Sequence, residues 1–405
     1  MFEPLRLIAG DSTLRLIVAT TLLFGAGSSA IAPYQALIGI DVYGLPDWSW
    51  SVVLIGSAVL AVIAAVGLGV VTDQLDNRKV AVVLCAILIV TGGLLVWVAD
   101  TQAAFLVTHI VLWPTGGALF GQIFSMTRLA ARRFDPELRD SVIAAMRAIF
   151  ALSFVIALPF WSMAFGAGMP LRMIYPVIAG LGLANLLLVT LFWTPHTTHD
   201  LRDERSGLSF YRSLAEIATL PIMARVFWLA AILASNVLYM TMMGLLFEAA
   251  PNRTFADAAL FLTLVTAMEV PFMLATGAWI RRWGKIRLIL FGGMFYACFL
   301  IAFTALISSP FIWPLSIAAA LGAALLLSVP ITYLQDLLAH RPGAGGALPA
   351  VTQVTGFLIA GTVFALGTTI GDYALVATIG AAIAAVSTVV LGFIEARAGN
   401  LRRPG

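Results

Sequence analysis

The chain has 405 residues, of which 61% are hydrophobic and 11% are charged, and its mean hydropathy is +1.00. Soluble domains carry about 25% charged residues, so this composition excludes a soluble globular protein and indicates an integral membrane protein. The formal net charge is only +3, and we expect no nucleic-acid partner. Both cysteines, Cys85 and Cys298, fall in apolar runs, which predicts core residues and neither a disulfide nor a metal site.

Twelve apolar segments are long enough to cross a bilayer, which takes about 20 helical residues. They are residues 14–38, 51–71, 80–99, 103–126, 141–165, 173–193, 225–247, 255–280, 286–307, 311–334, 347–370 and 373–394. The first of them has no cleavage site followed by a soluble domain, so we interpret it as a span and not as a signal peptide. The sequence therefore predicts an all-α membrane protein with twelve transmembrane helices.

The cations lie mostly on one side of this arrangement. If the N-terminus is cytoplasmic, 20 of the 23 Lys and Arg residues fall in cytoplasmic segments, only Arg172 and Arg253 fall in outer loops, and Arg147 lies within a span. The positive-inside rule then predicts that both termini are cytoplasmic. The longest connection, residues 194–223, is a predicted cytoplasmic linker between an N-terminal six-helix bundle (1–193) and a C-terminal one (224–405).

Two connections at matching positions in these halves share a pattern. In each, a glycine lies four residues before a charged residue at the predicted inner end of a helix, and a basic turn follows. The first copy contains Gly69, Asp73, Arg78 and Lys79, and the second contains Gly277, Arg281, Gly284 and Lys285. This repetition predicts two six-helix pseudo-repeats. We expect both copies to act in gating, with Arg128 as a candidate partner of Asp73.

The motif pair, the twelve spans and the charge pattern together resemble the major facilitator superfamily. Further strings resemble its bacterial sugar efflux transporter family: Glu269-Val270-Pro271, Arg281-Arg282-Trp283-Gly284-Lys285, Gln335-Asp336-Leu337, Met146-Arg147-Ala148, and Asn236 with Tyr239. The resemblance covers most of the chain. It implies the major facilitator fold and the export of sugars or glycoside-like molecules through the inner membrane, driven by proton antiport with alternating access.

Glu269 lies near the middle of the apolar run 255–280, two residues before Pro271. A carboxylate at that depth costs about 3 kcal/mol or more, and a proline bends the helix and frees a backbone carbonyl. Because desolvation disfavours the charged form of a carboxyl group, such a residue suits proton uptake. We predict that Glu269 is the proton-coupling residue. The alternative is a protonated structural acid between helices.

Polar residues in other spans are candidates for substrate binding. Asn236 and Tyr239 are three residues apart, on one face of the seventh span, and their amide and phenol groups both donate and accept hydrogen bonds, as sugar hydroxyls require. Further substrate-binding candidates are His109, Trp113, Arg147 and Gln353. For each of these residues a structural role in helix packing is the alternative.

Glycine pairs at small-xxx-small spacing, Gly117 with Gly121 and Gly367 with Gly371, predict close helix packing. The chain has no Walker pattern, no cluster of catalytic groups and no metal-ligand cluster. We therefore expect no cofactor, no metal and no enzymatic activity.

The sequence favours a monomeric, multi-pass protein of the bacterial inner membrane, with a small-molecule substrate, protons and membrane lipids as partners. One alternative is a multidrug or amphiphile proton antiporter of the same superfamily, which Met240, Met242 and Met243 would favour. The lower alternatives are a non-transporting membrane sensor and a membrane-embedded enzyme.

Overall fold

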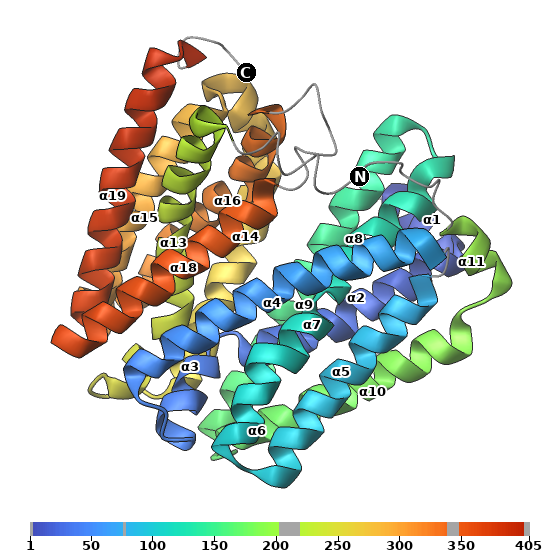
Figure 1. The fold of residues 1–405 in the computed structure, drawn as a ribbon, viewed down its shortest axis with the longest axis horizontal. Coiled ribbons are helices and arrows are strands. Elements are labelled where there is room, and N and C mark those ends of the chain that lie inside the picture. The colour runs from blue at the N-terminus through green and yellow to red at the C-terminus, as the bar shows by residue number, and fades with distance from the viewer. Residues whose placement is uncertain (1–2, 76–77, 202–218, 338–347, 401–405) are drawn as a thin grey trace. The chain divides into compact units, whose positions relative to one another are not determined.

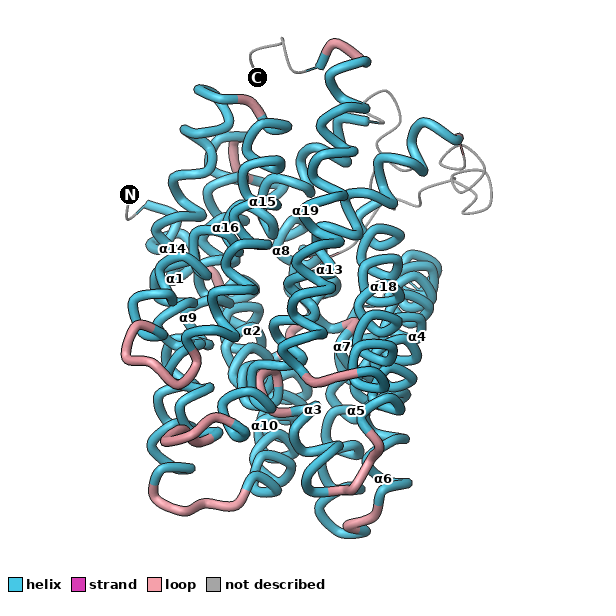
Figure 2. Tube along the Cα trace, turned by 90° about the vertical axis from the view of Figure 1, so that its left-hand side faces the viewer, coloured by secondary structure: helices cyan, strands magenta, loops and turns pink. Residues whose placement is uncertain are grey.

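The computed structural model describes residues 3–75, 78–201, 219–337 and 348–400. Over these ranges the chain forms helices joined by short loops, with no strand (Figure 2). Among the described residues, twelve helices or helical segments are long and apolar enough to cross a membrane. The predicted all-α membrane fold with twelve spans is confirmed, and the chain is a multi-pass membrane protein.

The first six spans and the short helical segments that connect them begin near the N-terminus and end before residue 202. They are α1 (Glu3–Gly10), α2 (Ser12–Ile31), α3 (Gln35–Leu37), η1 (Ile38–Val42), α4 (Asp47–Leu75), α5 (Arg78–Ala99), α6 (Gln102–Val107), η2 (Thr108–Leu112), α7 (Trp113–Gly117), α8 (Leu119–Ala130), η3 (Ala131–Arg133), α9 (Pro136–Gly166), η4 (Leu171–Met173), α10 (Ile174–Phe192) and α11 (Pro195–Asp200).

The last six spans are six long helices. They are α13 (Leu220–Ala249), α14 (Phe255–Trp283), α15 (Lys285–Leu306), α16 (Ile312–Leu337), α18 (Leu348–Ile370) and α19 (Tyr373–Arg397). Polar residues mark several helix starts. The Asp372 side chain accepts a hydrogen bond from the backbone of Leu375, and Thr254 and Asp257 form a capping box at the start of α14. These caps satisfy backbone N–H groups that have no partner inside the helix.

Two predicted spans are interrupted where proline removes a backbone donor. The span expected over residues 14–38 ends as a regular helix at Ile31, and Pro33 separates it from α3. The span expected over 103–126 contains the π-helical turn η2, in which the Trp113 N–H bonds to the Thr108 carbonyl, directly before Pro114. π-Helical turns are frequent at functional positions. His109 lies within this turn, so the interruption keeps His109 among the candidate site residues.

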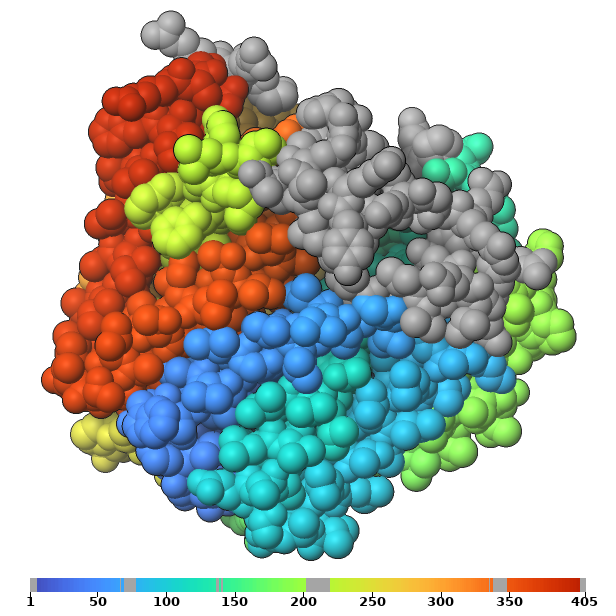
Figure 3. All heavy atoms as spheres, in the orientation of Figure 1, coloured from blue at the N-terminus to red at the C-terminus, as the bar shows by residue number. Residues whose placement is uncertain are grey.

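The chain divides into two compact units. Unit 1 comprises Met1–Ala32, Val42–Gly44 and Gly56–Ser206, and unit 2 comprises Pro33–Asp41, Leu45–Ile55 and Gly207–Gly405. In unit 1, α2 packs against α9 and α10, and α5 lies beside α10 (Figures 1 and 3). In unit 2, α13 packs in the same way against α18 and α19, and α15 lies beside α19. This repeated pairing agrees with the two predicted pseudo-repeats.

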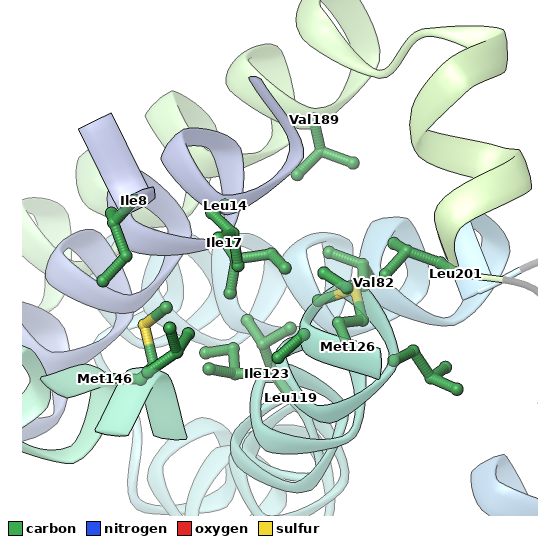
Figure 4. Packing of buried hydrophobic residues seen from close by; sticks show 14 of the residues in the cluster. Ile8, Leu14, Ile17, Val82, Leu119, Ile123, Met126, Met146, Val189 and Leu201 are labelled. Carbon is green, nitrogen blue, oxygen red and sulfur yellow. The ribbon is translucent and has the colours of Figure 1, made fainter. Parts of the chain in front are cut away.

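A hydrophobic cluster holds the helices of unit 1 together (Figure 4). It joins Leu14 of α2, Val82 of α5, Ile123 of α8 and Met146 of α9, all of which are buried. Burying such side chains stabilises a fold in water. In a membrane, close complementary packing supplies the corresponding stabilisation, because lipid is as apolar as the side chains.

Glycines allow the closest helix contacts. A Cβ at Gly93 of α5 would lie 2.7 Å from the carbonyl oxygen of Tyr175, and one at Gly367 would lie 2.6 Å from Val376. The predicted close packing at Gly367 and Gly371 is confirmed, since both approach side chains of α19 or its first turn. The same prediction for Gly117 and Gly121 is wrong, because no described atom outside their own helix lies within 4 Å of either position.

Candidate functional site

Four polar residues of unit 2 form a group that we call the α13–α15 polar group: Asn236 and Tyr239 of α13, Glu269 of α14 and Tyr296 of α15. The Asn236 Nδ2 donates a hydrogen bond to the Tyr296 hydroxyl at 2.8 Å. The rings of Tyr239 and Tyr296 meet edge to face, with centroids 6.3 Å apart. The two predicted residues Asn236 and Tyr239 therefore lie together, and both contact Tyr296.

The Tyr239 hydroxyl is the unusual member of this group. The side chain is 1% exposed, and its ring packs against Phe299 and Phe303 with centroid separations of 5.3 Å each. The hydroxyl has no hydrogen-bond partner among the described residues. A buried hydroxyl without a partner costs free energy, so this group is ready to bond to a ligand or a water.

Glu269 is half-buried and lies two residues before Pro271, which cannot donate to the carbonyl of Ala267. It interacts electrostatically with Tyr239 and Tyr296. Within the described ranges it makes no ion pair and no hydrogen bond that would neutralise it. A carboxyl group so placed can hold or release a proton, or accept hydrogen bonds from a ligand's hydroxyls.

His109 lies elsewhere, in the interior of unit 1. It is 5% exposed, and its Nε2 lies 3.1 Å from the Tyr175 hydroxyl. Its ring stacks on Phe105 and meets Trp113 at an angle, and the Trp113 Nε1 donates to the Ile89 carbonyl at 3.1 Å. The structure thus brings two predicted residues into one aromatic cluster in which their polar atoms already have partners. This supports the packing alternative, and the predicted substrate role stays untested.

The remaining two substrate-binding candidates are not part of either group. Arg147 of α9 and Gln353 of α18 are both exposed. Neither side chain has a hydrogen-bond or ion-pair partner in the portion of the chain that the structure describes. Their predicted contact with substrate stays a prediction.

The first gating motif lies partly outside what the structure describes. The backbone of α4 runs through Gly69 and Asp73, but their side chains lie outside the described residues. Arg78 opens α5, is 5% exposed and donates to the Gln122 side chain of α8 at 3.2 Å. Arg128 is exposed on α8. The expected pairing of Arg128 with Asp73 remains a prediction.

The second gating motif forms the turn between α14 and α15. Gly284 has a φ of 80°, a left-handed conformation that favours glycine, and its N–H closes α14 on the Ile280 carbonyl. Lys285 pairs with Asp336 of α16, while Gly277 and Arg281 are exposed. This motif therefore links the ends of three helices of unit 2, which is compatible with the predicted gating role.

Sequence reasoning missed two functional candidates. Tyr296 lies in an apolar run, and its hydroxyl gives no periodic signal that would mark a site. Glu395 was placed beyond the last predicted span, but α19 continues to Arg397 and buries the Glu395 carboxylate completely. It pairs there with Arg225 of α13. The sequence signal for this contact is the presence of opposite charges, Arg225 and Glu395, near the ends of two predicted spans.

One cluster has the geometry of a metal site. Carboxylate oxygens of Asp11 and Asp200 and a ring nitrogen of His196 lie close together. However, the Arg133 guanidinium forms ion pairs with both carboxylates. This positive charge already satisfies the two acids, so the cluster is explained as a structural tie between α2, η3 and α11, and it gives no support for a metal.

The fold and the polar group together define a membrane transporter with two six-helix repeats. Residues 117–360 match the sequence family described as Major Facilitator Superfamily. This match covers more than half of the chain, and the protein belongs to the Major Facilitator Superfamily.

Relatives carry names that agree with the resemblance seen in the motifs. Sugar efflux transporter C of Escherichia coli (strain K12) is 24% identical over 84% of this chain and 85% of its own length. A putative sugar efflux transporter of Deinococcus radiodurans is 22% identical over 86% of this chain and 89% of its own length. These matches confirm the similarity to bacterial sugar efflux transporters.

Solved structures share the fold at low identity. The nucleoside transporter NupG aligns with a TM-score of 0.76 and 16% identity over 95% of this chain and 99% of that chain. The peptide transporter POT in complex with sulfate aligns with a TM-score of 0.74 and 15% identity over 97% of this chain and 96% of that chain. The family implies a small-molecule substrate, and these proteins are named as transporters and not as enzymes.

Proposed function

We propose that the protein exports sugars or sugar-like small molecules by proton antiport with alternating access. The observation that carries this proposal is the α13–α15 polar group, which combines Asn236, Tyr239 and Tyr296 with an acid, Glu269, that has no ion-pair partner among the described residues. The names of the related transporters support sugar as the substrate class.

The chemistry of the group suits hydroxylated ligands. The Asn236 amide donates to Tyr296 through Nδ2, which leaves its Oδ1 as an acceptor. The Tyr239 hydroxyl has no hydrogen-bond partner among the described residues and is available as a donor. Neighbouring sugar hydroxyls both donate and accept, so one ligand can satisfy an amide oxygen and a phenol together.

Glu269 would exchange the proton for the substrate. In its charged form the carboxylate accepts hydrogen bonds from sugar hydroxyls, and this favours the loaded state. Protonation from the acidic side removes those acceptors and favours release. Reorientation in the protonated, empty form would return the proton to the cell interior, and the proton gradient would thereby drive export.

A multidrug or amphiphile antiporter is the second candidate. Met242 and Met243 are buried in α13 and give no exposed methionine surface, whereas Met240 is half-buried. An aromatic cluster of unit 1 gives stronger support, because Phe120 is 42% exposed and its ring lies 5.0 Å from that of Phe150. An apolar ligand portion could pack on these rings.

The proposal includes the setting of the protein. The bacterial relatives support a location in the inner membrane, and the cation distribution supports an orientation with both termini in the cytoplasm. It acts as a monomer with protons and membrane lipids as partners. The longest span elements in each unit, such as α9 and α13, present enough apolar residues to cross the bilayer.

Glu269→Gln tests the proposal, because glutamine keeps the shape and the hydrogen-bonding capacity but cannot titrate. Purified protein would be reconstituted in liposomes and assayed with a panel of labelled mono- and disaccharides and lipophilic cations. We expect the variant to lose accumulation driven by a pH gradient and to retain downhill exchange. If Glu269→Gln still accumulates substrate against its gradient, the proposal is wrong. Uptake of lipophilic cations but of no sugar would favour the second candidate.

A further inference from the structure

We infer that one open face of unit 1 binds a substrate that carries a carboxylate beside an aromatic portion. This face, which we call the α8–α9 aromatic face, consists of Phe120 and Phe124 of α8 and Arg147, Phe150 and Phe154 of α9. The inference rests on the proposed function, because it narrows the class of sugar-like substrates to acidic glycosides with an aromatic aglycone.

The four phenylalanine rings of this face form a continuous row. The Phe120 ring lies 4.8 Å from that of Phe124 and 5.0 Å from that of Phe150, measured between centroids. The Phe150 and Phe154 centroids are 5.4 Å apart. Phe120 is exposed, and the other three rings are half-buried. The row therefore offers partly uncovered apolar surface on which an aromatic ligand can stack.

The side of α8 that carries two of these rings is not covered by another described helix. Gly117, Phe120, Gly121 and Phe124 recur at helical spacing, which places them on one side. A Cβ at Gly117 or Gly121 would meet no described atom of another helix within 4 Å. In the part of unit 1 that the structure describes, this side is thus open to a ligand.

Arg147 lies on the same side of α9 as the aromatic row. Phe150 and Phe154 follow it by three and seven residues, so the helical repeat aligns the three side chains. The Phe150 ring packs against rings of α2 and α8, and this side is therefore turned toward other helices of unit 1. Leu152 and Ile156, which are exposed, lie on the opposite side and give α9 an apolar surface suited to lipid.

The charge of Arg147 is not balanced by a described residue. The Arg147 side chain is exposed and forms no ion pair within the described ranges. The unit 1 acids Asp11, Asp100 and Asp200 pair with other arginines. An unpaired cation within a span is costly, and such residues commonly mark a substrate pathway. A guanidinium binds a carboxylate through two parallel hydrogen bonds, so an acidic substrate would supply the missing charge.

A matched pair of ligands tests the inference. The para-nitrophenyl β-glucuronide and the para-nitrophenyl β-glucoside share the aryl group and the sugar ring, and the first has a carboxylate where the second has a hydroxymethyl group. Isothermal titration calorimetry measures the binding of each to the purified protein. We expect the glucuronide to bind about tenfold more tightly, as one hydrogen-bonded charge pair allows. Glucuronate, which lacks the aryl group, should bind more weakly than the aryl glucuronide.

Variants of one arginine assign the preference to this face. Arg147→Met removes the charge and keeps a long side chain, and it should weaken glucuronide binding about tenfold while leaving glucoside binding unchanged. Arg147→Lys keeps the charge without the paired donors and should restore part of the preference. Arg172→Met is the control, because Arg172 is an arginine of unit 1 that already pairs with Asp100. It should keep the native preference.

The aromatic row has its own test. Phe120→Ala removes the most exposed ring of the row and should weaken both aryl ligands to the same extent, while the binding of glucuronate stays unchanged. Aryl ligands that bind Phe120→Ala as they bind the native protein would contradict stacking on this face.

The outcomes separate this inference from the proposed function. Equal binding of glucuronide and glucoside by the native protein, or a preference that persists in Arg147→Met, overturns the inference and leaves sugar export unaffected. If Arg147→Met weakens the binding of phosphatidylglycerol and leaves glucuronide binding unchanged, the face binds lipid and the inference is also wrong. A native protein that binds neither of the two glycosides nor any mono- or disaccharide would instead contradict the proposed function.

Discussion

Arg225 donates a hydrogen bond from Nε to the Oε1 of Glu395 at 2.5 Å, and the Glu395 side chain is fully buried. The Tyr333 hydroxyl donates to the same oxygen at 2.8 Å, and the Asn400 Nδ2 donates to the other oxygen at 2.7 Å. One carboxylate thus joins α13, α16 and α19 of unit 2.

Loss of the Arg225 charge should destabilise unit 2. Arg225→Ala leaves the Glu395 carboxylate buried without its cation, and such a change costs about 3 kcal/mol or more. Thermal unfolding of the detergent-solubilised protein measures it. The double variant Arg225→Met with Glu395→Met removes both charges and should recover most of the loss. Equal destabilisation of the single and double variants would contradict this account.

Removal of the Tyr239 hydroxyl should separate stability from transport. Tyr239→Phe keeps the ring packing on Phe299 and Phe303 and deletes a buried hydroxyl without a described partner. We expect the free energy of unfolding to increase by about 1 kcal/mol, and the rate of transport of hydroxylated substrates to fall about tenfold. Parallel unfolding and liposome assays check both. A variant that is less stable than the native protein would show that the hydroxyl is bonded in the native state.

Asp41, which lies in η1 outside the spans, should make stability depend on pH. Burial raises the pKa of its carboxyl, and the negative charges of Glu248 and Asp47 raise it further. The folded state therefore binds the proton more tightly than the unfolded state does. The charged form consequently lowers stability as the pH rises above the ordinary carboxyl range.

Asp41→Asn should accordingly raise the unfolding temperature near pH 7, and the gain should vanish below about pH 3, where the carboxyl is protonated in both the folded and the unfolded state. Asp100→Asn is the matched comparison, because Asp100 pairs with Arg172 at 2.8 Å and its neutralisation should give no gain. An advantage of Asp41→Asn that persists at low pH would have another cause than titration.

A pair of glycine variants tests the helix contacts. Gly93→Ala places a methyl group against the Tyr175 carbonyl and should destabilise unit 1 by about 1–3 kcal/mol. Gly117→Ala meets no described neighbour and should be neutral or slightly stabilising, since alanine favours the helix. Fluorescence-detected gel filtration after heating compares the two. Similar losses in both variants would contradict the packing assigned to Gly93.

Cysteine labelling tests the predicted orientation. In a background without Cys85 and Cys298, a cysteine replacing the exposed Asn252 should react with an impermeant thiol reagent added to intact cells. One replacing the exposed Arg282 should react only after the cells are opened. The cation distribution is the physical reason. The reverse labelling pattern would place both termini outside the cytoplasm.

Much of the fold could be predicted from the sequence, because apolar length and cation asymmetry are strong signals in a membrane protein. The twelve spans follow from these signals alone. The interruptions in the first and fourth spans could not be predicted in detail. Pro33 and Pro114 are visible in the sequence, but whether a proline gives a turn, a kink or a π bond depends on the helices that pack beside it.

The candidate site was predicted in part, for a different reason. Glu269 could be singled out because a carboxylate inside an apolar run is costly, and Asn236 and Tyr239 share a helix face. Tyr296 and Glu395 depend on contacts across 60 and 170 residues of chain. No local pattern encodes such pairings. His109 is the opposite case: its polar side chain stands out in the sequence, but in the structure it forms a hydrogen bond with the Tyr175 hydroxyl.

Unit 2 combines two short segments near the N-terminus with the C-terminal half of the chain, and this has a consequence for synthesis. The Tyr34 hydroxyl donates to the Phe255 carbonyl at 3.0 Å, and the Tyr373 hydroxyl donates to Asp47 at 3.1 Å. Tyr34 and Asp47 are therefore synthesised and inserted before their partners, which follow more than 200 residues later in the chain. The first residues of these pairs are made early and packed late. Because Tyr373 belongs to the last helix, α19, the contacts of Asp47 are complete only after that helix has left the translocon.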